Sequence, residues 1–485
     1  HLENKDGKIL VYLMMYYICE NGVCKEIIKL SQHDIKDLHI NIDEEIKIVE
    51  KEDNISLAKN QIEAVKEAIN NGVTIITGGP GTGKTTTINT IIKIFENNDQ
   101  KVVLCAPTGR AAKRMSETSN KEAKTIHRLL EMGFGSDSEE LVFFKDEEDP
   151  IDADVIILDE ASMVDIILMY NLLKAVKLGT RVLLVGDSDQ LPSVGAGNVL
   201  KDIIDSGVMS VVTLKEIFRQ AQESDIVMNA HKIVNGEHID LTSKDKDFFF
   251  MQRLEYGELQ DLVVELCKTR LPKAYDYSPI DDIQVLSPTR KGPAGTVELN
   301  KRLQQELNPP AAGKSEVKTP VYTFRKGDKV MQTKNDYEIL WKKYITEDKT
   351  ESGAGIFNGD IGIIIAVNKI LKTVTIDFEG RIAVYDKQML DNLELAYAIT
   401  VHKSQGSEFD VVILTVFGGF DKLYYRNLLY TAVTRAKRML IIVGSKKRVD
   451  FMIDNNKRTL RYTALKNMLM ELVEGDDSGQ QTLDI

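Results

Sequence analysis

The sequence predicts an α/β protein with two parallel-sheet domains and a small β-barrel inserted into the second domain. Short apolar strands separated by helical stretches recur in two regions, which is typical of parallel sheets with helices on both faces. From Thr323 to Met389 the pattern changes to short alternating strands joined by Gly-Asp turns, which favours a barrel. With 485 residues, 43% of them hydrophobic, the chain can form two or more cores.

The elements are expected in a definite order along the chain. Residues 1–53 show no catalytic signature and are expected to be the remnant of an N-terminal accessory region, followed by the first domain over 54–225. The second domain is expected over 226–322 and 390–470, with the barrel at 323–389, and a polar, acidic, disordered tail over 471–485. A small hairpin insertion is expected at 131–154. The expected strands are 73–77, 102–106, 155–158 and 182–185 in the first domain, 283–286, 411–416 and 439–443 in the second, and 328–332, 361–367, 373–378 and 381–385 in the barrel.

The net charge of −12 looks unsuited to binding an anionic polymer, but its distribution is uneven. The acidic excess lies in residues 1–53, 131–154 and 471–485, and the rest of the chain is mildly basic. A groove in such a core can hold phosphates without making the whole protein basic.

Cysteine usage and hydropathy predict the compartment. The cysteines at 19, 24, 105 and 267 form no Cys-x-x-Cys pair, so buried free thiols are expected rather than disulfides or a zinc site. The longest apolar run near the N-terminus, Leu10–Ile18, is far shorter than the ~20 residues of a membrane span. No secretory signal is visible. We therefore expect a cytoplasmic, bacterial-type, nucleoid-associated protein with no membrane partner.

A phosphate-binding loop is the strongest motif. Gly78–Thr85 fits G-x-x-x-x-G-K-[ST] and lies between an expected strand and an expected helix, as the mechanism requires. Backbone amides and the helix N-terminus would hold the phosphates of ATP, Lys84 would reach the β and γ oxygens, and Thr85 would ligate Mg²⁺. The expected nucleotide-binding residues here are Gly79, Pro80, Gly81, Thr82, Gly83, Lys84, Thr85 and Thr86. The alternative is an ordinary glycine-rich turn.

Two further strands end in polar residues. Asp159 and Glu160 follow the apolar strand at 155–158, and Asp159 is expected to hold Mg²⁺ while Glu160 acts as the base for the attacking water. Gln190 follows the strand at 182–185 at the sheet edge where ligands collect, so it is a candidate γ-phosphate sensor. The alternatives are a surface turn and an ordinary strand exit, respectively.

Seven motifs, taken together, resemble superfamily 1 helicases. They span most of the chain and occur in the order of that superfamily: Gly78–Thr85, Ala106–Arg110, Asp159–Ser162, Gly186–Pro192, Ile217–Gln220, Val401–Gly406 and Tyr430–Arg435. Ile217–Gln220, Leu286–Gly292 and Phe324–Asp336 are most similar to the RecD-like branch, whose members move 5′ to 3′. The resemblance implies two RecA-like P-loop domains, a pin hairpin and an SH3-like barrel.

The resemblance also implies site residues. Arg219 and Arg435 would be arginine fingers at an ATP site between the two domains, where they would stabilise charge on the γ-phosphoryl group. Gln61 would read adenine and Glu408 would contact ribose. The implied DNA contacts are Thr108, Arg110, His127, Thr289, Arg290, Thr400, His402 and Ser404. For each of these residues taken singly, the alternative is a purely structural role. Such roles are a helix cap, a surface ion pair or, for His127, a core or capping histidine.

The resulting expectation is an ATP-dependent helicase that moves along single-stranded DNA, 5′ to 3′, in DNA repair or recombination. Its partners would be single-stranded DNA and junctions of single-stranded and duplex DNA. We expect a monomeric motor, with replication or repair proteins as candidate partners. A regulatory ATPase switch and a DNA-binding module without enzymatic activity are the rival interpretations. The second α/β domain disfavours the switch, and the intact Lys84, Thr85, Asp159 and Glu160 disfavour the module.

Overall fold

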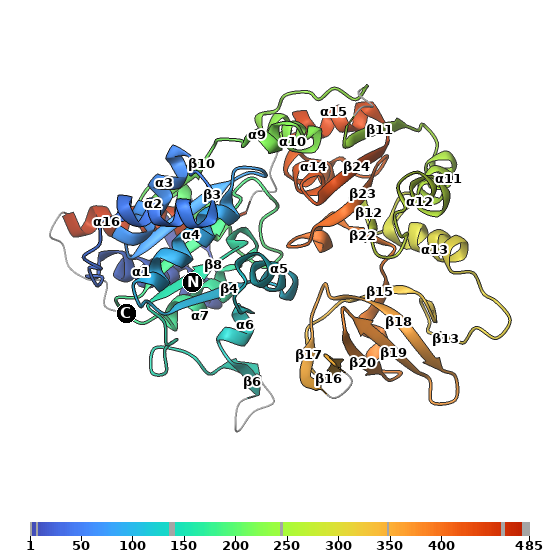
Figure 1. The fold of residues 1–485 in the computed structure, drawn as a ribbon, viewed down its shortest axis with the longest axis horizontal. Coiled ribbons are helices and arrows are strands. Elements are labelled where there is room, and N and C mark those ends of the chain that lie inside the picture. Colours follow the sequence, from blue (N-terminus) through green and yellow to red (C-terminus); the bar gives the residue numbers. More distant parts are fainter. Residues whose placement is uncertain are drawn as a thin grey trace. The chain divides into compact units, whose positions relative to one another are not determined.

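The chain divides into two compact units. A computed structural model describes residues 2–5, 8–134, 141–242, 246–346, 349–456 and 461–477. Unit 1 comprises residues 1–222 and 459–485, and unit 2 comprises residues 223–458. Each unit contains a parallel sheet, so the expectation of two α/β domains is confirmed (Figure 1).

The sheet of unit 1 has six parallel strands in the order β10-β3-β9-β8-β4-β5. Their bounds are β3 Val73–Gly78, β4 Val102–Ala106, β5 Ala123–Thr125, β8 Val155–Leu158, β9 Arg181–Gly186 and β10 Ser210–Leu214. Neighbouring strand residues point to opposite faces, and here both faces are buried. Ile75, for example, belongs to one hydrophobic cluster and Ile76 to another.

Helices cover both faces of this sheet. One cluster includes side chains of α1 (Met14–Gln32), α7 (Ile166–Lys174), α8 (Val199–Ser206) and α16 (Leu465–Asp477). The other includes α2 (Ile42–Asp53), α3 (Lys59–Asn70) and α4 (Lys84–Asn97). Unit 1 also contains β1 Leu2–Lys5, β2 Lys8–Val11, α5 Gly109–Ser119, α6 Ile126–Leu129, η1 Ala161–Met163 and α9 Arg219–Gln222.

Both ends of the chain differ from the expected boundaries. Val23 and Ile27 of α1 are fully buried in the core of unit 1, so the N-terminal segment is an integral part of that unit. At the other end, residues 459–470 belong to unit 1 and not to the second domain. The prediction of a disordered tail was wrong for residues 471–477, because α16 continues to Asp477 and Leu472 packs against the core. Residues 478–485 lie outside the described residues.

The insertion at 131–154 contains the expected hairpin. β6 (Met132–Phe134) pairs antiparallel with β7 (Leu141–Phe143), with Gly133 opposite Val142. The residues between the two strands, 135–140, are outside the described part of the chain.

The sheet of unit 2 has five parallel strands in the order β11-β24-β23-β12-β22. Their bounds are β11 Phe248–Gln252, β12 Ile283–Ser287, β22 Ala398–Thr400, β23 Phe409–Val416 and β24 Ala436–Gly444. The three expected strands are confirmed with slightly longer bounds, while β11 and β22 were missed. The surrounding helices are α10 Asp225–Asn235, α11 Tyr256–Glu265, η2 Leu266–Arg270, α12 Leu271–Tyr275, α13 Thr296–Leu307, η4 Val401–Ser404, η5 Asp421–Leu423, α14 Arg426–Val433 and α15 Lys446–Asp454.

The inserted region forms a seven-stranded antiparallel sheet, ordered β17-β16-β20-β19-β18-β15-β21. Its strands are β15 Lys329–Gln332, β16 Asp336–Tyr344, β17 Thr350–Ile356, β18 Ile361–Asn368, β19 Thr373–Phe378, β20 Arg381–Tyr385 and β21 Leu393–Leu395. The four expected strands are confirmed, and the hairpin of β16 and β17 was missed. A short pair, β13 Glu316–Lys318 with β14 Thr323–Arg325, precedes them, and η3 Met389–Asn392 precedes β21.

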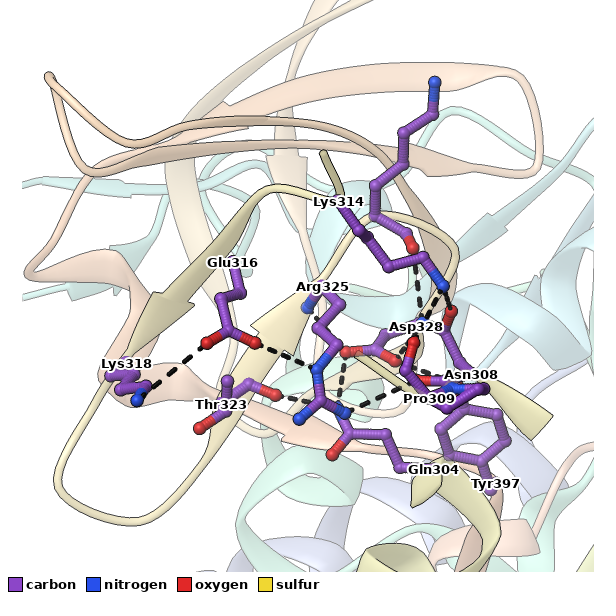
Figure 2. Close-up of polar contacts among 11 residues, drawn as sticks. Gln304, Asn308, Pro309, Lys314, Glu316, Lys318, Thr323, Arg325, Asp328 and Tyr397 are labelled. Atoms are coloured by element: carbon purple, nitrogen blue, oxygen red, sulfur yellow. Dashed lines mark hydrogen bonds and ion pairs between the residues drawn. The ribbon is translucent and has the colours of Figure 1, made fainter. Parts of the chain in front are cut away.

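The carboxylate of Asp328 joins this insertion to the α/β part of unit 2 (Figure 2). Asp328 is fully buried and accepts hydrogen bonds from Gln304 Nε2 (2.6 Å) and Asn308 Nδ2 (2.6 Å), at the end of α13. It also accepts from the hydroxyl of Tyr397 (2.9 Å) and from the backbone N–H of Arg325 (2.7 Å). Burial raises the pKa of Asp328, and these donors oppose that rise. A buried carboxylate with this many donors fixes the orientation of the elements that it connects.

The cysteines and the hydropathy of the helices can be compared with the sequence analysis. All four cysteines are buried free thiols, which confirms the prediction. Within the described ranges, no helix combines the length and apolarity needed to cross a membrane.

Candidate nucleotide site and nucleic-acid interface

The phosphate loop connects β3 to α4 at the carboxyl edge of the unit 1 sheet. Lys84 opens α4, and its Nζ donates to the carbonyls of Gly78 (2.5 Å) and Gly79 (2.9 Å). The Thr82 hydroxyl also donates to Gly79, at 2.9 Å. The ammonium group of Lys84 thus contacts the phosphate loop itself. Thr85 is exposed at the start of α4.

Gly83 cannot be replaced without disturbing this loop. Its φ is +78°, which side chains rarely tolerate. A Cβ at this position would lie 2.4 Å from Gln61 Nε2 and 2.6 Å from the ring of Phe218. Gln61 Nε2 donates to Gly83 O at 3.1 Å, and Phe218 N donates to Gly81 O at 3.2 Å. Phe218 lies in the motif Ile217–Gln220, but the sequence analysis singled out only Arg219 from that motif and missed the contact of Phe218 with the phosphate loop.

Asp159 and Glu160 lie at the exit of β8, beside β4 in the same sheet. The backbone N–H of Glu160 donates to Asp159 Oδ1 at 2.8 Å. Burial, followed by the neighbouring charge of Glu160, raises the pKa of Asp159. Glu160 has a φ of +53°, an uncommon conformation for a residue with a side chain, and such strain concentrates at functional sites.

A cation that the sequence analysis missed faces Glu160. Arg114, on α5, places Nη1 3.7 Å from Glu160 Oε1. Its charge also opposes the rise in the pKa of Asp159, as does the charge of Lys84. The spacing of Arg110 and Arg114 on one helical face could have drawn attention to this arginine.

The loop after β9 is tied to the phosphate loop's own strand. The Ser188 N–H donates to Thr77 Oγ1 on β3 at 3.4 Å. Gln190 is buried, and its Nε2 donates to Asp187 Oδ2 at 3.3 Å. The structure therefore gathers Lys84, Glu160 and Gln190 on loops at one edge of one sheet, although their chemical roles stay predictions.

The C-terminal segment also holds the loop after β9. Arg461 Nη1 donates to the carbonyls of Gly195 and Gly197 at 2.6 Å each, and Nη2 donates to the carbonyl of Ser193. Three carbonyls of the segment that follows Gln190 are thus held by one guanidinium. The sequence could not reveal this, because Arg461 follows the whole of unit 2 in the chain.

The two expected arginine fingers belong to different units. Arg219 lies in unit 1, directly after Phe218, as the expected bounds of the first domain imply. Arg435 lies in unit 2, where it is almost completely buried and donates to Thr431 O (3.2 Å) and Ser407 O (3.1 Å). Glu408, for which a ribose contact was predicted, directly follows Ser407 in the chain. Their roles at ATP stay predictions.

In unit 1, the expected DNA contacts surround the exits of β4 and β5. Thr108 caps α5 by accepting from Ala111 N at 3.2 Å, and Arg110 lies in the first turn of that helix. Burial lowers the pKa of His127, and its ring lies 5.9 Å from that of Phe143 in the hairpin. The packing of His127 agrees with a core role, and its contact with DNA stays a prediction.

In unit 2, the expected DNA contacts gather where β12 and β22 end. Ser287 pairs with Thr400, so the segments that follow these two residues leave the same sheet edge. The Thr400 hydroxyl caps η4, and His402 is exposed. Ser404 is fully buried, and its hydroxyl donates to Val401 O at 2.8 Å. Thr289 and Arg290 lie on the loop after β12, so the structure brings these predicted residues together.

Comparison with known proteins identifies the family. Three family models match: the AAA domain at residues 61–196, the SH3 domain of ATP-dependent RecD-like DNA helicases at 299–378, and the UvrD-like helicase C-terminal domain at 395–443. The chain is 31% identical over 450 residues to the RecD subunit of the RecBCD enzyme of Mycobacterium tuberculosis, a match that covers 84% of this chain and 72% of that relative. This chain belongs to the RecD-like helicases of superfamily 1.

A second relative and a solved structure were also matched. The chain is 35% identical over 396 residues to the ATP-dependent RecD2 DNA helicase of Deinococcus radiodurans. This match covers 80% of the chain but only 49% of that relative. The chain thus spans about half the length of that protein. Among solved structures, the Pif1 helicase from Bacteroides in complex with ADP-AlF3 and single-stranded DNA is 20% identical to this chain. The match covers 88% of this chain and 98% of the Pif1 chain, with a TM-score of 0.47.

Proposed function

We propose that this RecD-like chain is an ATP-dependent DNA helicase that moves 5′ to 3′ along single-stranded DNA. One observation carries the proposal. The phosphate loop, Glu160 and Gln190 meet at the edge of the unit 1 sheet, while the motif segments 286–292 and 401–406 follow two paired strands at one edge of a second parallel sheet. An ATPase with a second domain of this kind can convert hydrolysis into relative motion.

ATP hydrolysis would use the residues at the edge of the unit 1 sheet. The β and γ phosphates would replace the carbonyls of Gly78 and Gly79 as partners of Lys84. Oxygen ligands suit Mg²⁺, which takes few protein carboxylates when phosphates supply the rest, so Thr85 and Asp159 fit its requirements. Bound Mg²⁺ would neutralise charge that develops on the phosphates. Glu160 would accept the proton of the attacking water.

The DNA grip would come from hydroxyls, amides and cations at strand exits. Thr108 and Arg110 in unit 1, and Thr289, Arg290 and His402 in unit 2, lie at such exits. Contacts to phosphates hold the strand without reading its bases, which a motor that moves along any sequence requires. The β6–β7 hairpin would separate duplex ends, and the barrel would close over the emerging strand.

Unwinding of tailed duplexes tests the function and its polarity together. We expect the protein, with ATP and Mg²⁺, to separate a duplex that carries a 5′ single-stranded tail, and to leave the matched 3′-tailed duplex largely intact. Strand separation is measured with a fluorophore and quencher on the two strands. A preference for the 3′ tail would contradict the polarity.

The rival interpretation makes a different prediction from the same reagents. A regulatory ATPase switch would hydrolyse ATP at one rate whether single-stranded DNA is present or not, whereas the motor needs DNA to complete its cycle. We expect single-stranded DNA to stimulate hydrolysis. We also propose that the protein acts as a monomer in DNA repair or recombination in a bacterial cytoplasm, beside replication or repair proteins.

A further inference from the structure

One carboxylate in unit 2 holds two cations at the edge where DNA is proposed to bind. Glu394 lies in β21, the edge strand that pairs with β15 of the inserted sheet. Its Oε1 accepts from Arg290 Nη2 at 2.5 Å, and its Oε2 accepts from Lys403 Nζ at 3.0 Å. Arg290 follows β12 and Lys403 lies in η4, so the three side chains come from three different elements.

This group is accessible from solvent. The Arg290 side chain is 55% exposed, compared with 31% for Lys403 and 23% for Glu394. The buried phenol of Tyr322 hydrogen-bonds to Arg290 and fixes one side of the guanidinium. Glu394 therefore lies deeper than the cations, and a ligand that approaches from solvent meets the guanidinium first.

The contacts of Glu394 resemble those of a phosphate. A carboxylate and a phosphodiester both present one negative charge shared by two oxygens on a central atom, and Arg and Lys bind either with the same kind of hydrogen bond. The ion pairs that Glu394 makes are partly exposed, and such pairs contribute little to stability. Replacing the carboxylate of Glu394 by a DNA phosphate at these two cations therefore involves only a small change in free energy.

We propose that Arg290 and Lys403 form a phosphate seat for single-stranded DNA, which Glu394 occupies when no DNA phosphate is present. The proposal rests on the proposed DNA-binding function and deepens it. A motor must release each phosphate as it steps, and an internal carboxylate that competes for the same cations weakens the grip. It also returns the two cations to one defined position between contacts.

The experiment compares Glu394→Gln with the unaltered chain in binding a fluorescein-labelled oligothymidylate, followed by anisotropy over a series of salt concentrations. Glutamine keeps the shape and the acceptor oxygen but removes the competing charge. We expect up to about fivefold tighter binding at low salt. The plot of log affinity against log salt should steepen by about 0.7, because one more cationic charge is available to phosphates.

The matched control is Glu306→Gln. Glu306 forms a comparable exposed ion pair with Lys268 in the same unit, so this variant makes the same change in net charge away from the seat. It should bind as the unaltered chain does. Adding Glu394→Gln to an Arg290→Ala variant should give a smaller gain in affinity than adding it to the unaltered chain, because only Lys403 is then released.

The possible failures are distinguishable. If the unaltered chain binds the oligonucleotide, and Glu394→Gln is folded but binds with the same or weaker affinity and an unchanged salt dependence, Glu394 merely positions the cations and the exchange is refuted. If Glu306→Gln gives the same gain, the effect is one of net charge and the seat is refuted. If the unaltered chain binds no single-stranded DNA at all, the proposed function fails, and the phosphate seat fails with it.

Discussion

At the residue scale, Glu160 combines a proposed chemical role with an unusual backbone conformation. It stands in the left-handed region at φ +53°, next to the half-buried Asp159 and within 3.7 Å of the guanidinium of Arg114. Residues are held in such conformations only when their surroundings determine them strongly. The strand exit therefore presents this carboxylate in one fixed orientation.

Replacing Glu160 with glutamine tests its role as the base. Glutamine keeps the size of the side chain but cannot accept the proton, and loss of a general base lowers rates by about 10²- to 10⁴-fold. We expect steady-state ATP hydrolysis with single-stranded DNA to fall by at least about 100-fold, while binding of a fluorescent ATP analogue persists. Glu117→Gln, on the exposed face of α5, is the matched control and should retain activity. Hydrolysis within twofold of the unaltered rate in Glu160→Gln would exclude this base.

Residues close in sequence to a motif were predictable, and residues brought near by folding were not. Lys84, Asp159 and Gln190 each follow an apolar strand, and parallel strands place their carboxyl ends on one edge. Arg114, Phe218 and Arg461 contact the same loops, but the sequence analysis assigned none of them to the site. The spacing of Arg114 from Arg110 and the place of Phe218 in a helicase motif were the available signals, whereas Arg461 had none. Their partners are set by how helices and the C-terminal segment pack, which local pattern does not encode.

At the element scale, the docking of α16 depends on two buried carboxylates. Thr463 donates to Asp202 Oδ2 at 3.0 Å, and the Ala464 N–H donates to Glu20 Oε2 at 3.1 Å. Burial raises the pKa of Asp202 from 3.8 to about 6, and burial also raises the pKa of Glu20. The start of α16 is therefore attached to α8 and α1 through groups that are easier to protonate than usual.

This raised pKa makes stability depend on pH. Between pH 3.8 and about 6 the folded chain binds a proton at Asp202 that the unfolded chain has lost. The contribution of Asp202 to the free energy of unfolding is therefore full below pH 3.8, falls as the pH rises to about 6, and is constant above that. We expect Asp202→Asn to stabilise the protein at pH 7.5 by up to about 3 kcal/mol, since two pKa units correspond to that energy.

Calorimetric melting temperatures at two pH values check this expectation. The gain from Asp202→Asn should be present at pH 7.5 and should shrink toward pH 4.5. Asp205→Asn changes an exposed carboxylate on the same helix, paired with Lys201, and should stabilise the protein at neither pH. An Asp202→Asn variant that melts lower than the unaltered chain at pH 7.5 would show that the ionised form is the stabilising one.

Long apolar strands were the most predictable elements. Residues 102–106, 155–158, 373–378 and 381–385 were predicted with the observed bounds, because a continuous or strictly alternating apolar pattern leaves few alternatives. β16 and β17 were missed, since most of their residues are exposed, and charged residues such as Lys342 and Lys343 or glycines such as Gly353 interrupt their apolar residues. Their pairing with each other, rather than burial, defines them as strands.

At the scale of the whole molecule, unit 2 is inserted into the sequence of unit 1. The chain leaves unit 1 after Gln222 and returns at Thr459, so α16 completes a core that begins with α1 (Figure 1, the helix labelled α16). Sequence patterns gave both sheets but placed the boundary of the second domain at 470. The return of the chain to unit 1 was not predictable, because the apolar face of α16 does not by itself indicate which unit it packs against.

Truncation after residue 458 tests this arrangement. The truncated chain loses the fully buried Leu465 and Leu469, and Met468 beside them, which together contribute on the order of 5 kcal/mol of apolar burial. It also loses the hydrogen bonds of Arg461 to the segment after Gln190. We expect amide hydrogen exchange to quicken in α1, α8 and residues 193–197, while β23 and β24 of unit 2 keep their protection. A chain truncated after residue 477 keeps α16 and should exchange as the full chain does. Faster exchange throughout unit 2, or no change in α1, would show that α16 does not belong to the core of unit 1.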